Sequence, residues 1–217
     1  MPTPHDVGVT SLRWLAGVSG GTLLALIFAI AEYRLARARW WSTAGAALRT
    51  IRDLLRALPV VALVPIVQEI GVQERWKIAL IAWAVMFPIW VSVAQALTDE
   101  MIDTELALTG AGIDRRGLLV SYQLPKALAG LFRGVEIAIG IGWISVVAAE
   151  WVGIISPGFW DGGLGFRIEM AHSANNWVSM LLCLALFGLL GAVTAAAWRV
   201  VMKHPIGRYH LSRGSVI

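Results

Sequence analysis

Five long blocks of apolar residues constrain what this chain can fold into more than any other feature of its sequence. A helix needs roughly 20 apolar residues to cross the hydrocarbon layer of a lipid bilayer. Charged residues make up only 15% of the chain, whereas a soluble domain carries about 25%. We therefore expect an all-α integral membrane protein, a single domain over residues 1–217 with about five transmembrane helices. The expected spans are 14–33, 54–70, 78–97, 135–155 and 177–198.

The block at 54–70 differs from the other four because Pro59 and Pro65 interrupt it. Proline is tolerated in membrane helices where neighbouring helices satisfy the carbonyl groups that it leaves free. The two prolines are therefore either the sites of two kinks or part of a gate, and the sequence leaves both interpretations open.

Basic residues are distributed unevenly between the two sides of the membrane in this topology. If the N-terminus lies outside, the inner segments are 34–53, 98–133 and the tail from 199, and they hold most of the 18 lysines and arginines. This asymmetry follows the positive-inside rule. We expect the N-terminus outside and the C-terminus in the cytoplasm. Because topology accounts for the net charge of +4, no nucleic-acid partner is expected.

The inner loop 98–133 is long enough to have structure of its own. Acidic residues at its start favour a helix N-terminus, and Gly110 and Gly112 then interrupt the helix. Asp114 is suited to cap a second short helix, which would stop at Leu124–Pro125. The sequence predicts two short helices joined by a glycine turn on the inner surface.

A glycine and a Leu-Pro pair stand at a characteristic distance in this loop. Gly112 is followed by nine residues, 113–121, then by Tyr122, Gln123 and the pair Leu124–Pro125. This spacing resembles the cytoplasmic signature of permease subunits of binding-protein-dependent ABC importers, which reads Glu-Ala-Ala, three residues, Gly, nine residues, Ile, one residue, Leu-Pro.

The first part of that signature is only partly matched. Counting back from the glycine, the three positions hold Leu106, Ala107 and Leu108, so only the middle one agrees. The nearest glutamate, Glu105, comes one residue early. The acidic member of the signature is therefore displaced in this chain.

The resemblance covers roughly residues 10–200. The runs RALPVVALVPI (56–66), KIALIAWAVMFPI (77–89), AIGIGWISVVAAE (138–150) and GGLGF (162–166) look like those of permeases for sulfonates, taurine, nitrate and bicarbonate. Relatives usually carry one more membrane helix before 14–33, which is not evident here. This difference leaves open whether the chain pairs with its own copy or with a different permease.

The resemblance implies the type I ABC importer permease fold, with a cytoplasmic coupling helix around 106–118, in a bacterial plasma (inner) membrane. The chain itself would be no enzyme and would hold no cofactor and no metal; ATP and Mg would be held by a partner ATPase. The other implied partners are a second permease chain and an extracytoplasmic solute-binding protein. The residues expected to couple to the ATPase are Leu106, Ala107, Gly110, Gly112, Ile113, Asp114, Arg115, Leu124 and Pro125.

Four residues are candidates for the translocation pathway: Pro59, Pro65, Trp143 and Glu150. Acids within membrane segments are costly and are functional candidates by default. For Glu150 the sequence leaves two interpretations open, a pathway or gate role and a structural hydrogen bond near the outer surface.

We therefore expect a permease subunit that carries a small solute, with an anion such as a sulfonate, nitrate or bicarbonate favoured by the resemblance. The alternative is a self-sufficient secondary carrier or channel, although no inverted internal repeat is evident. A third possibility is a membrane anchor without transport. Deleting 106–118 separates the first two, because only the importer needs that segment for coupling to ATP.

Overall fold

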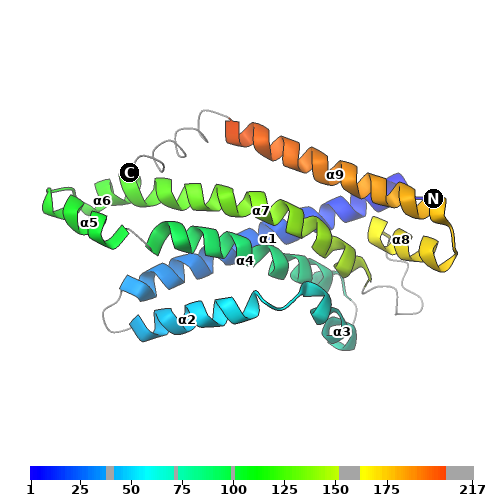
Figure 1. The fold of residues 1–217 in the computed structure, drawn as a ribbon, viewed down its shortest axis with the longest axis horizontal. Coiled ribbons are helices and arrows are strands. Elements are labelled where there is room, and N and C mark those ends of the chain that lie inside the picture. Colours follow the sequence, from blue (N-terminus) through cyan, green and yellow to red (C-terminus); the bar gives the residue numbers. More distant parts are fainter. Residues whose placement is uncertain (38–41, 71–72, 99–100, 152–161, 204–217) are drawn as a thin grey trace.

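The computed structural model describes residues 1–37, 42–70, 73–98, 101–151 and 162–203, and these form helices connected by short turns (Figure 1). The helices are α1 (Pro4–Arg37), α2 (Ser42–Leu55), α3 (Val60–Ile70), α4 (Glu74–Thr98), α5 (Met101–Gly110), α6 (Arg115–Leu118), the π-helical turn η1 (Leu119–Gln123), α7 (Leu124–Trp151), α8 (Leu164–Ser173) and α9 (Trp177–Lys203).

Three long helices, α1, α4 and α7, form the middle of the bundle, and glycines set their spacing. A Cβ atom at Gly21 of α1 would lie 2.7 Å from the carbonyl oxygen of Ala82 on α4. Further along α4, a Cβ atom at Gly134 of α7 would lie 2.6 Å from the Cα atom of Ile89. Small residues let membrane helices approach closely, so these glycines bring both neighbours directly against the α4 backbone.

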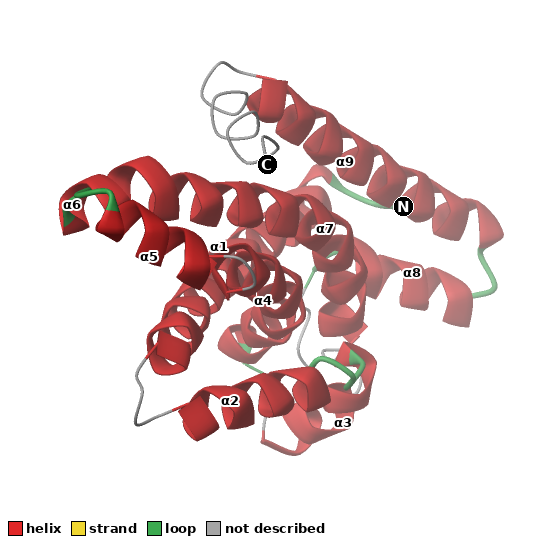
Figure 2. Ribbon diagram, turned by 60° about the vertical axis from the view of Figure 1, so that its left-hand side comes forward, coloured by secondary structure: helices red, strands yellow, loops and turns green. Residues whose placement is uncertain are grey.

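The remaining helices lie on the flanks of this core. Figure 2 shows α9 on one side, where it packs against α7 and α8, and α2 and α3 on the other. The outward faces of α1 and α9 are covered by exposed apolar side chains, which include Leu12, Leu15, Leu23 and Ile27 of α1 and Leu181, Leu189, Val193 and Val200 of α9. An apolar surface of this extent is suited to lipid and not to water.

Four helices of the described part are long and apolar enough to cross a membrane: Pro4–Ala36, Glu74–Leu97, Arg115–Trp151 and Trp177–Met202. Together with the sequence composition, they make the chain a multi-pass membrane protein. The first and third of these helices begin earlier than the expected spans, at Pro4 where 14 was expected and at Arg115 where 135 was expected. The reason is that the more polar segments before both spans are part of the same continuous helices. The expected span 135–155 runs past residue 151 into a part outside the described residues.

The expectation of a fifth continuous span at 54–70 is not met. α2 ends at Leu55, a turn follows, and α3 begins only after Pro59. A residue that precedes a proline is disfavoured in the α-helical conformation, and proline donates no backbone hydrogen bond. α3 has 11 residues, about half of the roughly 20 that a spanning helix needs.

α2 and α3 nevertheless carry the chain back along the bundle, from the end of α1 to the start of α4 (Figure 1). The first residues of α1 lie near α8 and the start of α9, at the end of the bundle away from α5 and α6 (Figure 1). We call the end that carries α5 and α6 the loop end, and the end that carries α8 the opposite end.

Candidate functional site

The turn after α5 is a helix C-cap that requires glycine. The N–H of Gly112 donates to the carbonyl of Thr109 at 3.0 Å, and the N–H of Ile113 donates to the carbonyl of Leu108 at 3.1 Å. Gly112 has φ +85°, the left-handed conformation that closes this pair of hydrogen bonds and that glycine adopts without steric cost. The glycine of the predicted signature therefore ends α5 and reverses the chain.

Asp114 begins the next helix, as the sequence predicts. Its side chain accepts a hydrogen bond from the N–H of Gly117 at 2.8 Å and so caps α6. The predicted stop at Leu124–Pro125 is wrong, because the helix continues through the π-helical turn η1 into α7. In this widened turn Leu124 donates to the carbonyl of Leu119, and the altered bonding just before Pro125 lets a residue without an N–H enter the helix.

The loop formed by α5, α6 and η1 lies at the loop end of the bundle (Figure 1). It carries exposed apolar side chains. They are Leu106, Ile113, Leu119 and Val120, of which Leu106 is 67% exposed. Arg115 and Arg116 are exposed beside them. We call these four apolar residues the loop patch.

Under the loop, a buried hydrogen-bond network joins three elements. The carboxylate of Glu105 on α5 accepts from the hydroxyl of Tyr33 on α1 at 2.9 Å and from the amide of Gln123 in η1 at 2.6 Å. The same amide donates to the hydroxyl of Tyr33 at 3.0 Å. Glu105 is 3% exposed, so the network fastens the loop to the bundle from inside.

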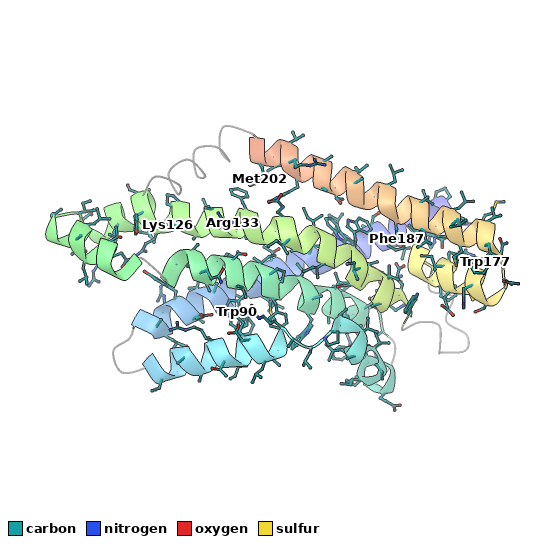
Figure 3. All side chains as sticks on the ribbon, in the orientation of Figure 1. Trp90, Lys126, Arg133, Trp177, Phe187 and Met202 are labelled. Carbon is teal, nitrogen blue, oxygen red and sulfur yellow. The ribbon has the colours of Figure 1, made fainter. Side chains whose placement is uncertain are left out.

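A hollow of about 750 Å³ lies between the α2–α3 turn, α4 and α7. Its walls are largely apolar, with Trp83, Phe87 and Ile137 among the lining residues. Two arginines also line it: Arg56, which pairs with Asp53 at 3.5 Å, and Arg133 on α7 (Figure 3). Its size and its mixture of apolar walls with a few polar groups are typical of small-molecule sites.

Of the four candidate pathway residues, Pro59 lines this hollow. Pro65 lies within α3 and Trp143 within the packed core, and neither is among its lining residues. The indole N–H of Trp143 donates to the hydroxyl of Thr194 on α9 at 2.9 Å, and its ring stacks on Trp14 of α1 with centroids 5.1 Å apart. The pathway roles of these residues stay predictions.

Glu150 lies in a buried network at the opposite end. Its carboxylate accepts from the hydroxyl of Thr10 at 2.8 Å, from Arg13 at 3.2 Å and from the N–H of Gly165 at 2.6 Å. Arg13 is held on its other side by Glu74, with Nη2 and Oε2 2.9 Å apart. Glu150 is 1% exposed and connects α7, α1 and α8 through these bonds.

The glycines of GGLGF make room for this carboxylate. A Cβ atom at Gly163 would overlap the Glu150 carboxyl group, and one at Gly165 would lie 2.9 Å from its Oε2 atom. Gly163 also has φ +118°, a conformation that side chains rarely allow. The AAE run and the GGLGF segment are therefore two halves of one contact. Of the two interpretations of Glu150 that the sequence allows, the structural hydrogen bond is present.

The burial of another acid, Glu32, was missed by sequence reasoning. Glu32, 1% exposed, accepts two hydrogen bonds from Arg52 of α2, at 2.9 and 3.0 Å, and one from the indole of Trp90 on α4 at 2.9 Å. From its place near the end of an apolar block, Glu32 is expected to be solvated, but the returning α2 covers it. The signal available in the sequence was the pair of arginines at 49 and 52, spaced to lie on one helix face.

Comparison with curated proteins finds permeases of ABC transport systems. The chain is 31% identical over 125 residues to the taurine transport system permease protein of Escherichia coli, covering 57% of this chain and 43% of that protein. It is 25% identical over 173 residues to the nitrate import permease protein of Synechococcus elongatus, covering 76% and 59%. A bicarbonate transport system permease protein of the same organism is 28% identical over 151 residues, covering 68% and 51%.

The fold is similar to that of a chain in inward-facing structures of the MetNI methionine ABC transporter. The TM-score is 0.69 at 17% sequence identity, and the match covers 91% of this chain and 93% of that one. No protein-family model matches the chain. The matched part spans 43% to 64% of the curated relatives' length.

The fold is the type I ABC importer permease fold, as expected. The resemblance to the permeases for sulfonates, taurine, nitrate and bicarbonate is confirmed by sequence similarity to members of that group.

Proposed function

We propose that this chain is the transmembrane permease subunit of an ATP-driven ABC importer. The observation that carries the proposal is the combination of this fold with a loop patch of exposed apolar side chains at the basic end of the bundle. Exposed apolar residues in a loop at one end of the bundle, beside the exposed Arg115 and Arg116, suit a protein partner.

In this proposal the loop end faces the cytoplasm. Arg115 and Arg116 of α6 lie at this end, as the positive-inside rule expects of a cytoplasmic side, and the start of α1 then lies outside. The partner is an ATPase subunit, which binds ATP and Mg, while this chain performs no covalent chemistry. The residues Leu106, Ala107, Gly110, Gly112, Ile113, Asp114, Arg115, Leu124 and Pro125 form or brace the surface that the ATPase contacts.

The hollow between α2, α4 and α7 forms one half of the translocation pathway, and a second permease chain supplies the other half. Arg133 is exposed on its wall, and a guanidinium presents several donors in a geometry that suits oxyanions. We infer that the solute is a small anion, of the kind named for the relatives, delivered by an external solute-binding protein.

The first experiment is to purify the chain gently from native membranes and identify the proteins that accompany it by mass spectrometry. An ATPase at stoichiometric level supports the importer, and a second permease sequence, or its absence, decides between a heteromeric and a homomeric pair. A chain that comes out alone and still transports after reconstitution would contradict the proposal and support a secondary carrier or channel.

A deletion of 106–118 provides an independent check. In an importer it abolishes ATP-dependent uptake because the ATPase loses its contact. In a carrier or channel the removed segment lies outside the membrane-crossing core, and uptake down a gradient is retained.

A further inference from the structure

Two neighbouring residues of the loop have opposite surroundings. Glu105 is 3% exposed and bonded to Tyr33 and Gln123, whereas Leu106 is 67% exposed. Successive residues of an α-helix are rotated by about 100°, so a shift of one residue is enough to turn a side chain from the surface to the interior of the bundle.

Because of this rotation, moving the acid of the signature by one residue changes the direction in which its side chain points. Counting back from Gly112, the acidic position is that of Leu106, which faces outward. The chain has its acid one residue earlier, where it faces inward. An acid that accepts two buried hydrogen bonds at once is not available to an outside partner.

We infer that Glu105 and Leu106 have two separate roles in the loop, one structural and one in binding the ATPase. Glu105 is a positioning residue that fastens the loop to α1 and η1 from inside, and Leu106 belongs to an apolar docking surface for the ATPase. The inference rests on the proposed function, because it takes the ATPase as the occupant of the loop patch.

The side chains of the loop patch indicate what kind of surface the ATPase would present to it. Leu106, Ile113, Leu119 and Val120 present apolar area, and Arg115 and Arg116 lie beside it. The complementary surface is a groove on the ATPase with an apolar floor and acidic residues along its rim. An ionic contact at position 106 is excluded, since no charge stands there.

A reciprocal exchange, Glu105→Leu with Leu106→Glu, tests the inference by moving the acid into the outward position. If an outward acid is what the ATPase needs, the exchange preserves or improves binding. By our inference it removes the inner fastening and puts a charge on the apolar surface, and burying that unpaired charge against the ATPase weakens association at least about tenfold. The measurement is the ATPase-to-permease ratio in the purified complex, together with its ATP hydrolysis.

The control is Thr50→Glu, which adds an acid at an exposed position of α2 outside the loop. It should leave the ratio at the wild-type value. The single variants Leu106→Glu and Glu105→Gln separate the two roles. The first should weaken ATPase association with unchanged thermal stability of the permease, and the second should lower the protection of the loop from proteolysis.

A labelling experiment covers the case in which the exchanged chain does not fold. In a Cys183→Ser background, Leu106→Cys should react with a water-soluble maleimide once the ATPase is stripped from inside-out vesicles, and should be protected before. Glu105→Cys should react in neither state. Equal labelling of Leu106→Cys in both states, or wild-type ATPase content in the exchange variant, overturns the inference. If the wild-type chain carries no ATPase at all, it is the proposed function that fails.

Discussion

Glu150→Ala should destabilise the chain strongly, because the carboxylate connects three helices inside the bundle. It accepts hydrogen bonds from Thr10, Arg13 and the N–H of Gly165, and it is 1% exposed. Removing one partner of a buried ion pair costs about 3–5 kcal/mol. Arg13 keeps its bond to Glu74, so we expect the lower end of that range, ~3 kcal/mol.

The assay is the thermal melting of the purified chain in detergent, followed by the fluorescence of its 11 tryptophans. In a chain of this size 1 kcal/mol shifts Tm by about 2–4 °C, so the expected loss is roughly 6–12 °C. The control is Glu136→Ala, which removes an exposed acid from the same helix and should leave Tm within about 2 °C of the wild type.

A double-mutant cycle makes this reasoning refutable in detail. Gly163→Ala places a Cβ atom on the Glu150 carboxyl group and should destabilise the wild-type chain. In the Glu150→Ala background the overlap is gone and only the backbone strain at φ +118° is left, so the same substitution should cost less. Additive costs, or a Glu150→Ala variant that melts like the wild type, would falsify the view that AAE and GGLGF form one contact.

Three further outcomes are expected. Gly112→Ala should lower the free energy of unfolding by about 1 kcal/mol, which is the cost of a left-handed conformation for a residue with Cβ. Gly110 has an ordinary helical φ and open space around it, so Gly110→Ala should be neutral or slightly stabilising in the same melting assay. Arg133→Glu should raise the solute concentration needed for half-maximal ATP-driven uptake at least about tenfold if the hollow admits an anion, and Arg199→Glu, exposed on α9 away from the hollow, should leave it unchanged. Trp143→Phe should cost at least about 1–2 kcal/mol in a melting experiment, because it keeps an aromatic side chain but removes the hydrogen bond to Thr194. A melt that matches the wild type would count against that bond.

The fold class could be predicted from the sequence because its cause is local. Long apolar blocks require lipid-facing helices whatever their partners are, and four of the five expected blocks are long helices. The same holds for the loop: Gly112 and Asp114 act on residues within five positions of themselves, so the glycine turn and the cap were both visible in the sequence. Pro59 also acts locally, because it separates α2 from α3. The prediction of a single span at 54–70 relied on the apolar composition and underestimated this effect.

The candidate sites were only partly predictable, because their partners come from distant parts of the chain. Thr10 and Glu150 are 140 positions apart, and no pattern in the sequence says which buried donors an acid will meet. Nothing local shows that Arg52 of the returning α2 covers Glu32, so the position of Glu32 near a helix end predicts solvation instead. The hollow is likewise formed by side chains of three helices that meet only when the bundle is assembled.

The sequence by itself therefore determined what each segment is: helices of membrane length and a loop reversed at a glycine. These properties depend on transfer of apolar groups into lipid and on backbone conformation, both of which are set by neighbouring residues. Only the tertiary structure decided which way Glu105 and Leu106 face and where Glu150 finds its partners. The direction of a side chain depends on how the helices are rotated against one another, and packing of the whole bundle fixes that rotation.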